Sequence, residues 1–320
     1  MKRFPLAVLT TALALAPLLG QAQAFPEKSI TFVVPFAAGT ATDQIARALG
    51  NSITAETKQP VIIDNKAGAS GFIASQNVAK APADGYTVLI TTNTTHAANE
   101  HLFKKLPYDP VKDFAPIAAL GKGGQIMVVN PSFPAKTVAE FVALAKKEPG
   151  KYSFGSGSSS SRMAGELLQQ MADIKLLHVP YKSNTLAVTD LLGGQIHMMI
   201  TDTATGLPQV KGGKLRALGM SSASRSPLAP DVPTIAEAGV KGYEMGYWFA
   251  AYVPARTPPA VVKRLQELLV AATKGPAAVK FYESSGVDAA VSTPEELAKF
   301  QAAESQKWGR IVKAANITPE

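Results

Sequence analysis

The residues best placed to do chemistry in this chain lie at two junctions between an apolar strand and a helix. Residues 30–34 lead into the run PFAAGTATD at 35–43, and residues 152–154 lead into GSGSSSS at 155–161. A helix that begins at such a turn has unpaired backbone N–H groups, with the positive end of its dipole behind them. Each junction therefore predicts an anion site. Two junctions predict two lobes that hold one anionic ligand between them.

Other residues of catalytic type lack the spacing that catalysis needs. The chain has no Gly-x-Ser-x-Gly nucleophile elbow, no phosphate loop and no complete dinucleotide fingerprint. Its 4 histidines include no His-Glu-x-x-His pair, and it has no cysteine. The sequence therefore predicts no catalytic residue, no metal site and no cofactor.

Two carboxylates and one histidine follow predicted strands near the junctions. Thr40-x-x-Asp43 resembles a capping box, so helix capping is the main role expected of Asp43. For Asp202, the roles of turn former and ligand contact both stay open. His96 lies in the polar loop after the strand at 86–91, where it either faces a ligand or packs as an ordinary histidine.

Strands and helices alternate along the chain and position these residues. The pattern predicts strands at 30–34, 61–63, 86–91, 126–129, 176–179 and 196–200, and helices from about residue 43, at 72–79, after Thr137, after the serine run, at 186–192, after Thr257 and after Thr293. This alternation is typical of α/β proteins with largely parallel sheets. Ligands of such proteins bind at the carboxyl ends of strands, where both junctions lie.

The N-terminus predicts export. Lys2 and Arg3 precede an apolar stretch at 6–19 and an Ala22-Gln23-Ala24 cleavage site, so residues 1–24 are expected to be a signal peptide cleaved after Ala24. The absence of cysteine fits a bacterial periplasmic protein whose core needs no disulfide. The net charge of +8 comes from scattered basic residues, without the clusters of a nucleic-acid surface.

An ordered set of motifs resembles one known family. The matching stretches are 34–39 with Asp43 and Arg47, DNKAGASG at 64–71, ADGYT at 83–87, LPYDPVKDF at 106–114, HVPYK at 178–182, DLLGGQ at 190–195 and PTIAEAG at 233–239. Together they resemble the extracytoplasmic substrate-binding proteins of tripartite tricarboxylate transporters, the Bordetella uptake gene type. The resemblance covers nearly the whole chain after residue 24.

This resemblance implies a two-lobed periplasmic binding protein of the type II-like, Venus-flytrap architecture, with two crossover segments at the hinge. The expected lobes are 25–124 with 246–320, and 125–245. A small carboxylate ligand would lie in the cleft between them. The residues expected to bind it are Phe36, Ala37, Ala38, Gly39, Thr40, Thr42, Asp43, Thr92, Asn93, Thr94, His96, Ser156, Gly157, Ser158, Ser159, Ser160, Ser161, Arg162, Tyr181 and Asp202.

The chain departs from the family pattern at its ligand loops. The first loop usually carries Pro-Gly-Gly, where this chain has residues 37–39 as AAG. The second is about two residues shorter than usual and rich in serine, with Arg162 in place of a histidine. Ser183 stands where glycine commonly follows Tyr-Lys. We expect Arg162 or the extra hydroxyl groups to meet an additional oxygen or second carboxylate of the ligand.

The sequence therefore predicts a periplasmic solute-binding protein, expected to be a monomer, that passes a carboxylate to membrane permease subunits. A sensor-input module, with a sensor kinase as partner, is one alternative, and an enzyme acting on organic acids is another. Dicarboxylates, aromatic acids, acidic amino acids and nicotinate-like acids all stay open as ligands.

Overall fold

The computed structural model describes residues 25–314 and 317–319, so the predicted signal peptide at 1–24 lies outside the described residues. Among the described residues, no helix combines the length and the apolar composition needed to cross a membrane. One mixed sheet of 10 strands runs through the described chain in the order β2-β1-β3-β9-β4-β7-β5-β6, with β8 and β10 also paired to β4.

The strands are β1 (Ile30–Val34), β2 (Val61–Asn65), β3 (Thr87–Thr92), β4 (Phe114–Val129), β5 (Ser153–Ser156), β6 (Leu177–Pro180), β7 (Met198–Asp202), β8 (Arg216–Met220), β9 (Gly246–Pro254) and β10 (Val287–Asp288). The helices are α1 (Ala41–Thr57), α2 (Phe72–Ala79), α3 (Asn99–Leu102), α4 (Val138–Lys147), α5 (Ser159–Ala172), α6 (Asn184–Leu192), α7 (Thr203–Lys211), α8 (Pro259–Ala272), α9 (Pro276–Ser285) and α10 (Pro294–Ala314). Two short turns complete the set, η1 (Ala69–Gly71) and the π-helical η2 (Thr94–Ala98).

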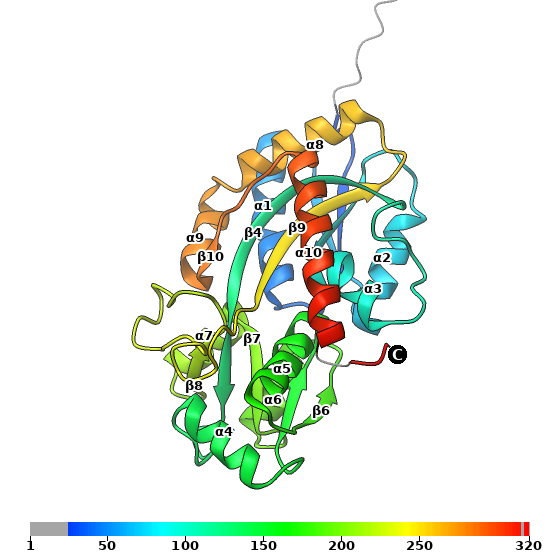
Figure 1. Cartoon of the computed structure of the whole chain (residues 1–320). Coiled ribbons are helices and arrows are strands. Elements are labelled where there is room, and N and C mark those ends of the chain that lie inside the picture. The colour runs from blue at the N-terminus through cyan, green and yellow to red at the C-terminus, as the bar shows by residue number, and fades with distance from the viewer. Residues whose placement is uncertain (1–24, 315–316, 320) are drawn as a thin grey trace, which may run out of the picture.

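Two α/β lobes share this sheet (Figure 1). The first lobe holds β1–β3, β10, α1–α3 and α8–α10, and the second holds β5–β8 and α4–α7. We call β4 and β9 the connecting strands, because β4 runs from the first lobe into the second beside β9 (Figure 1). From Phe114 to Gly124, β4 pairs with β9; from Gln125 onward it pairs with β7 of the second lobe.

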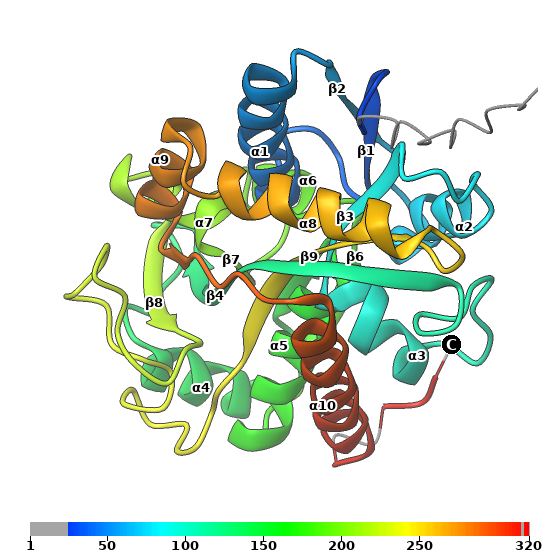
Figure 2. The ribbon, with the colours of Figure 1, turned by 90° about the horizontal axis from the view of Figure 1, so that it is seen from above.

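The first lobe buries both faces of β1 and β3. Phe32 and Val34 of β1 pack in one cluster with α1, α8 and α9, whereas Val33 faces the opposite cluster with α2 and α10, as the two-residue period of a strand requires. Figure 2 shows the same layers, with α1 and α8 on one side of β4 and α10 on the other. The helix face predicted from residues 45, 49 and 53 is fully buried.

The second lobe repeats this layering. Phe141 of α4 and Leu168 of α5 lie in the cluster on one face of β5 and β7. Leu191 of α6 and Leu207 of α7 lie in the cluster on the other face. Parallel strands buried on both sides therefore end together at one edge, which is the edge that faces the first lobe.

Several predicted elements are confirmed and others are wrong. The helix at 72–79 is found at those residues, and the predicted strand at 126–129 is only the end of the 16-residue β4. The sheet is parallel among β1–β3 and among β5–β7, but every pair that involves β4 or β9 is antiparallel. The expectation of largely parallel sheets is therefore wrong for the centre. There, the connecting strands pair antiparallel with their neighbours, and antiparallel pairs do not need the crossover helix that joins parallel strands.

Candidate ligand-binding site

A cavity lies where the two junctions meet the connecting strands. Its walls come from the first junction, the second junction, β7 and the connecting strands. The lining residues are Phe36, Thr40, Ala41, Thr42, Thr92, Gln125, Gly157, Ser158, Ser160, Asn184, Asp202, Tyr247 and Phe249.

The first wall is the N-terminus of α1. Thr40 caps this helix, and its Oγ1 accepts a hydrogen bond from the Asp43 amide at 3.5 Å. The amides of Ala41 and Thr42, in the first helical turn, have no acceptor within the helix, and both residues line the cavity. These amides and the dipole of the 17-residue α1 favour a bound anion.

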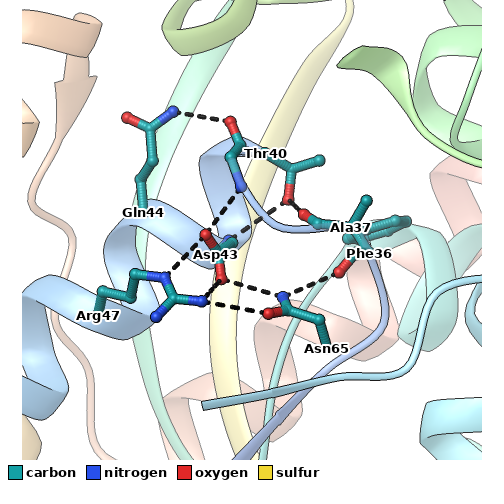
Figure 3. A network of polar contacts seen from close by, with 8 residues as sticks. Phe36, Ala37, Thr40, Asp43, Gln44, Arg47 and Asn65 are labelled. Atoms are coloured by element: carbon teal, nitrogen blue, oxygen red, sulfur yellow. Dashed lines mark hydrogen bonds and ion pairs between the residues drawn. The ribbon is translucent and has the colours of Figure 1, made fainter. Parts of the chain in front are cut away.

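A buried carboxylate fixes the loop in front of α1 (Figure 3). Asp43 is 2% exposed, and its Oδ2 accepts hydrogen bonds from the Gly39 amide at 2.9 Å and from Arg47 Nε at 3.0 Å. Its Oδ1 accepts from Asn65 Nδ2, which also donates to the Phe36 carbonyl, each at 3.0 Å. The network therefore ties both ends of the loop at 36–39 to α1 and β2. Asp43 stabilises the conformation of the loop through these hydrogen bonds and does not itself line the cavity.

The capping box expected at Thr40 and Asp43 is confirmed with one change. In a standard box the acidic side chain bonds to the amide of the capping residue itself. Here the Thr40 amide bonds to the Ala37 carbonyl, and the Asp43 carboxylate accepts the Gly39 amide, one residue earlier. The change follows from the tight turn at Gly39, whose φ of 83° is in the left-handed region.

The Asp43 network makes stability depend on pH. Burial, the largest single influence, raises the pKa of Asp43, but hydrogen bonds from Arg47, Gly39 and Asn65, with the Arg47 charge, outweigh it and leave the pKa below its ordinary 3.8. The folded protein therefore holds this proton less readily than the unfolded chain. The resulting stabilisation is complete above the ordinary pKa and is lost as pH falls through the lower folded-state value.

We expect the melting temperatures of the wild type and Asp43→Asn to differ by a constant amount from about pH 7 down to about pH 5, and to converge below about pH 4. Thermal unfolding followed by circular dichroism at several pH values measures this difference. A gap that widens on acidification would contradict the assignment of a lowered pKa to Asp43.

The second wall is the N-terminus of α5. Ser158 caps this helix by accepting the Ser161 amide at 3.2 Å, and Ser158 and Ser160 line the cavity. Gly157 donates its amide to Asn184 Oδ1 at 3.0 Å, and the nearby chain leaves no room for a side chain at this position. The serine run therefore caps α5 through Ser158, as the sequence indicates.

The floor of the cavity belongs to β7 and the connecting strands. Gln125 of β4 is the register partner of Asp202 of β7. Asp202 caps α7 through the Thr205 amide at 2.8 Å and accepts Asn184 Nδ2 at 3.1 Å. Tyr247 of β9 lies beside them, with its hydroxyl 3.3 Å from Thr203 Oγ1. Burial, followed by the Asp202 charge, raises the pKa of Tyr247, so its phenol stays protonated.

A larger chamber adjoins the cavity, and the two share Phe36, Gly157 and Ser158. Arg162 and Tyr181 line the chamber together with His178 and Lys182. Arg162 Nε lies 3.8 Å from Glu166 Oε1, and the Tyr181 hydroxyl donates to Asp190 Oδ2 at 2.7 Å. These two predicted ligand residues therefore lie in the outer chamber and not in the cavity.

The other expected site residues divide into three groups. Those in the cavity wall are Phe36, Thr40, Thr42, Thr92, Gly157, Ser158, Ser160 and Asp202. Ser156 and Ser159 line only the outer chamber. Ala37, Ala38, Gly39, Asp43, Asn93, Thr94, His96 and Ser161 line neither space.

His96 is placed in the core of the first lobe. It is fully buried, and its ring stacks on Tyr252 with centroids 3.9 Å apart. Burial lowers the pKa of His96 to about 3, so the ring is neutral. The polar run after β3 coils into η2 and packs against α10, which carries His96 away from the cavity.

The expected ligand residues did not include Ala41, Gln125, Asn184, Tyr247 and Phe249, which also line the cavity. Asn184 follows Ser183, and Ser183 caps α6 through its Oγ, which accepts the Leu186 amide at 3.4 Å. The departure from glycine at position 183 therefore gives α6 a cap and places Asn184 between Gly157 and Asp202. That departure was the available signal for Asn184. The sequence held no such signal for Gln125, because the glycines before it interrupt the apolar pattern of its strand.

Two α/β lobes, two connecting strands and a cavity between amide-rich helix ends define a periplasmic binding protein. The model of the tripartite tricarboxylate transporter family receptor, TctC, matches residues 45–317. The chain belongs to this family, and the resemblance read from the sequence is confirmed.

Individual relatives agree with this assignment. A UPF0065 protein from the tcbD-tcbE intergenic region of Pseudomonas sp. strain P51 is 36% identical over 90% of this chain and 87% of its own length. The structure of R. palustris Rpa4515 with adipate has a TM-score of 0.90 and 32% identity, covering 92% of this chain and 100% of that one. MatC (Rpa3494) from Rhodopseudomonas palustris, with bound malate, has a TM-score of 0.85 and 30% identity, covering 90% and 100%.

Proposed function

We propose that this protein captures a small carboxylate in the cavity between its lobes and delivers it to the membrane subunits of a tripartite tricarboxylate transporter. The observation that carries the proposal is the pairing of two capped helix N-termini, Thr40–Thr42 from one lobe and Ser158–Ser160 from the other, around one cavity. Each offers amide donors to an anion, and neither needs a cationic side chain.

The solved relatives support a carboxylate as the ligand. One is bound to adipate and another to malate, and both superpose on nearly the whole chain. Both ligands are organic acids of the kind that amide donors hold through charge-assisted hydrogen bonds.

Capture would work by lobe closure. We assign residues 25–124 with 246–320 to the first lobe and 125–245 to the second, which is supported by the change in the pairing of β4 at Gln125. Ser159 Oγ of α5 donates to Asn99 Oδ1 of α3 at 2.7 Å, which links the lobes directly. A ligand that bonds to both helix ends would stabilise a closed arrangement of the lobes over an open one.

The test is a thermal-shift panel on residues 25–320, freed of co-purified ligand, with mono-, di- and tricarboxylates, aromatic acids and amino acids. A ligand at about a hundred times its Kd adds roughly 2.7 kcal/mol of stability and raises the Tm by roughly 5–10 °C for a chain of this size. We expect one chemical class to shift the Tm and to be recovered unchanged by mass spectrometry. A panel without any shift would sink the proposal, and a consumed ligand would indicate an enzyme.

The same panel on Arg162→Ala tests the role proposed for Arg162. If a second carboxylate of the ligand reaches the outer chamber, this variant loses affinity for the long diacids that shift the wild type and keeps its affinity for short ones. Unchanged affinity for every acid would remove Arg162 from the site.

A further inference from the structure

The polar groups around the cavity differ between its walls and its floor. The walls are helix N-termini, which present N–H donors. The floor, at Gln125 and Asp202, presents oxygen atoms that accept hydrogen bonds. A ligand that is only an anion is matched by the walls and not by the floor.

Gln125 is the floor residue whose buried side chain is not fully hydrogen-bonded. It is 1% exposed, it lines the cavity, and its Oε1 has no hydrogen-bond partner among the residues that the structure describes. The backbone of Gln125 is fully used, because its amide donates to Ser221 Oγ at 2.7 Å and its carbonyl accepts the Ser221 amide at 2.8 Å. An unpaired buried acceptor costs free energy unless a ligand or a water supplies a donor.

Asp202 adds a second acceptor and a charge. Its carboxylate is 8% exposed and takes donors from Thr205, Asn184 and Thr201, so one of about four acceptor positions on a carboxylate is still open. The residues that line the cavity include no lysine, arginine or histidine. A second negative group of a ligand would therefore face the Asp202 charge without a compensating cation.

We propose that the cavity selects a small carboxylic acid that also carries a hydrogen-bond donor, an ammonium or hydroxyl group, which Gln125 and Asp202 bind. This inference rests on the proposed function and narrows its ligand class. The carboxylate of the ligand lies at the ends of α1 and α5, and the donor group lies on the floor. Gln125 then acts as a specificity-determining residue.

The test compares acids that differ in one substituent. Propionate, lactate and alanine carry hydrogen, hydroxyl or ammonium on the same carbon, and succinate, malate and aspartate form a second such set. Isothermal titration of residues 25–320 with each acid gives the Kd ratios within a set. We expect the hydroxyl or ammonium member to bind at least about tenfold more tightly than the hydrogen member, because only it satisfies the floor.

Two variants assign the effect to the floor. Gln125→Met keeps the side-chain length and the backbone bonds to Ser221, and we expect it to reduce the Kd ratio to within about threefold. Gln59→Met, just beyond the far end of α1, is the matched control and keeps the wild-type ratio. Asp202→Asn loses the charge and, with its Oδ1 toward the Thr205 amide, keeps the cap on α7, but its NH2 group then meets Asn184 Nδ2, which donates to Asp202 in the wild type. Both kinds of ligand are therefore weakened, and an ammonium ligand is weakened at least about tenfold more than a hydroxyl ligand.

Each outcome decides between this inference and the proposed function. Equal Kd values within both sets would overturn the inference and leave carboxylate capture standing, since a water would then satisfy Gln125. Succinate bound more tightly than malate and aspartate would also overturn it, by showing that Gln125 presents its NH2 group. No binding of any carboxylate would overturn the proposed function and the inference together.

Discussion

Gly157→Ala is expected to weaken ligand capture strongly, with affinity reduced by up to about 100-fold. A Cβ atom at this position would lie 1.8 Å from the carbonyl carbon of Ser183 and 2.1 Å from the nitrogen of Asn184. Both are backbone atoms, so no side-chain rotation relieves the overlap, and the loop before α5 must move away from the loop before α6. The Gly157–Asn184 hydrogen bond breaks, and the amides of Ser159 and Ser160 leave their positions.

The magnitude follows from overpacking. Forcing one extra carbon into a packed site typically costs about 1–3 kcal/mol, and about 3 kcal/mol corresponds to about 100-fold in affinity. Isothermal titration with the acid identified in the panel measures the affinity, and the Tm without ligand reports how much of the cost falls on folding.

Gly193→Ala is the matched control for Gly157→Ala. Gly193 ends α6 with a φ of −78°, and a Cβ there would come no closer than 3.6 Å to its neighbours. This variant should bind as the wild type does. Near-wild-type affinity of Gly157→Ala would show that the second junction does not hold the ligand.

The sequence predicts the junctions well because their signals are local. A helix cap, a glycine turn and the preceding apolar strand all lie within about ten residues, so the sequence places the two helices from about residue 43 and after the serine run, within a few residues of the observed starts of α1 and α5. The same holds for α8 and α10, where proline at the first helical position marks the start.

Elements with mixed signals are missed for equally physical reasons. Gly121, Gly123 and Gly124 interrupt the apolar pattern of β4, so only its final residues read as a strand. Gly206 and Pro208 lower the helical propensity of α7, yet tertiary packing of Leu207 in the core of the second lobe holds the helix. Here long-range packing outweighs local preference.

Of the cavity floor the sequence indicates only Asp202; Gln125 and Tyr247 could not be predicted, because their place there depends on pairing between distant strands. Gln125 and Asp202 are 77 positions apart and become neighbours only through the antiparallel register of β4 and β7. Tyr247 joins them through the pairing of β9 with β4. Conversely, His96 stands in a loop that reads as ligand-facing, and the π-helical turn η2 buries it.

Asp43→Asn should weaken binding by about tenfold or more, although Asp43 does not line the cavity. Gly39 and Arg47 donate to Oδ2, whereas Asn65 and the Arg47 Nη2 lie at Oδ1. Whichever way an asparagine amide turns, its NH2 group meets a donor. Hydrogen bonds to charged groups are worth about 1.5–3 kcal/mol. The loop at 36–39 should therefore loosen, and the amides of Ala41 and Thr42 should lose their fixed direction.

Asp64→Asn is the control for Asp43→Asn, because Asp64 precedes Asn65 on β2 and forms only a half-exposed ion pair with Lys66 at 2.9 Å. Such surface pairs contribute about 0–1 kcal/mol, so this variant should keep the wild-type Kd and a nearly unchanged Tm. If Asp43→Asn lowers the Tm but keeps the wild-type Kd, the network stabilises the fold without positioning the first junction. The variant removes no backbone amide from α1. If it raises the Kd as expected, binding therefore depends on the direction of the helix amides as well as on their number.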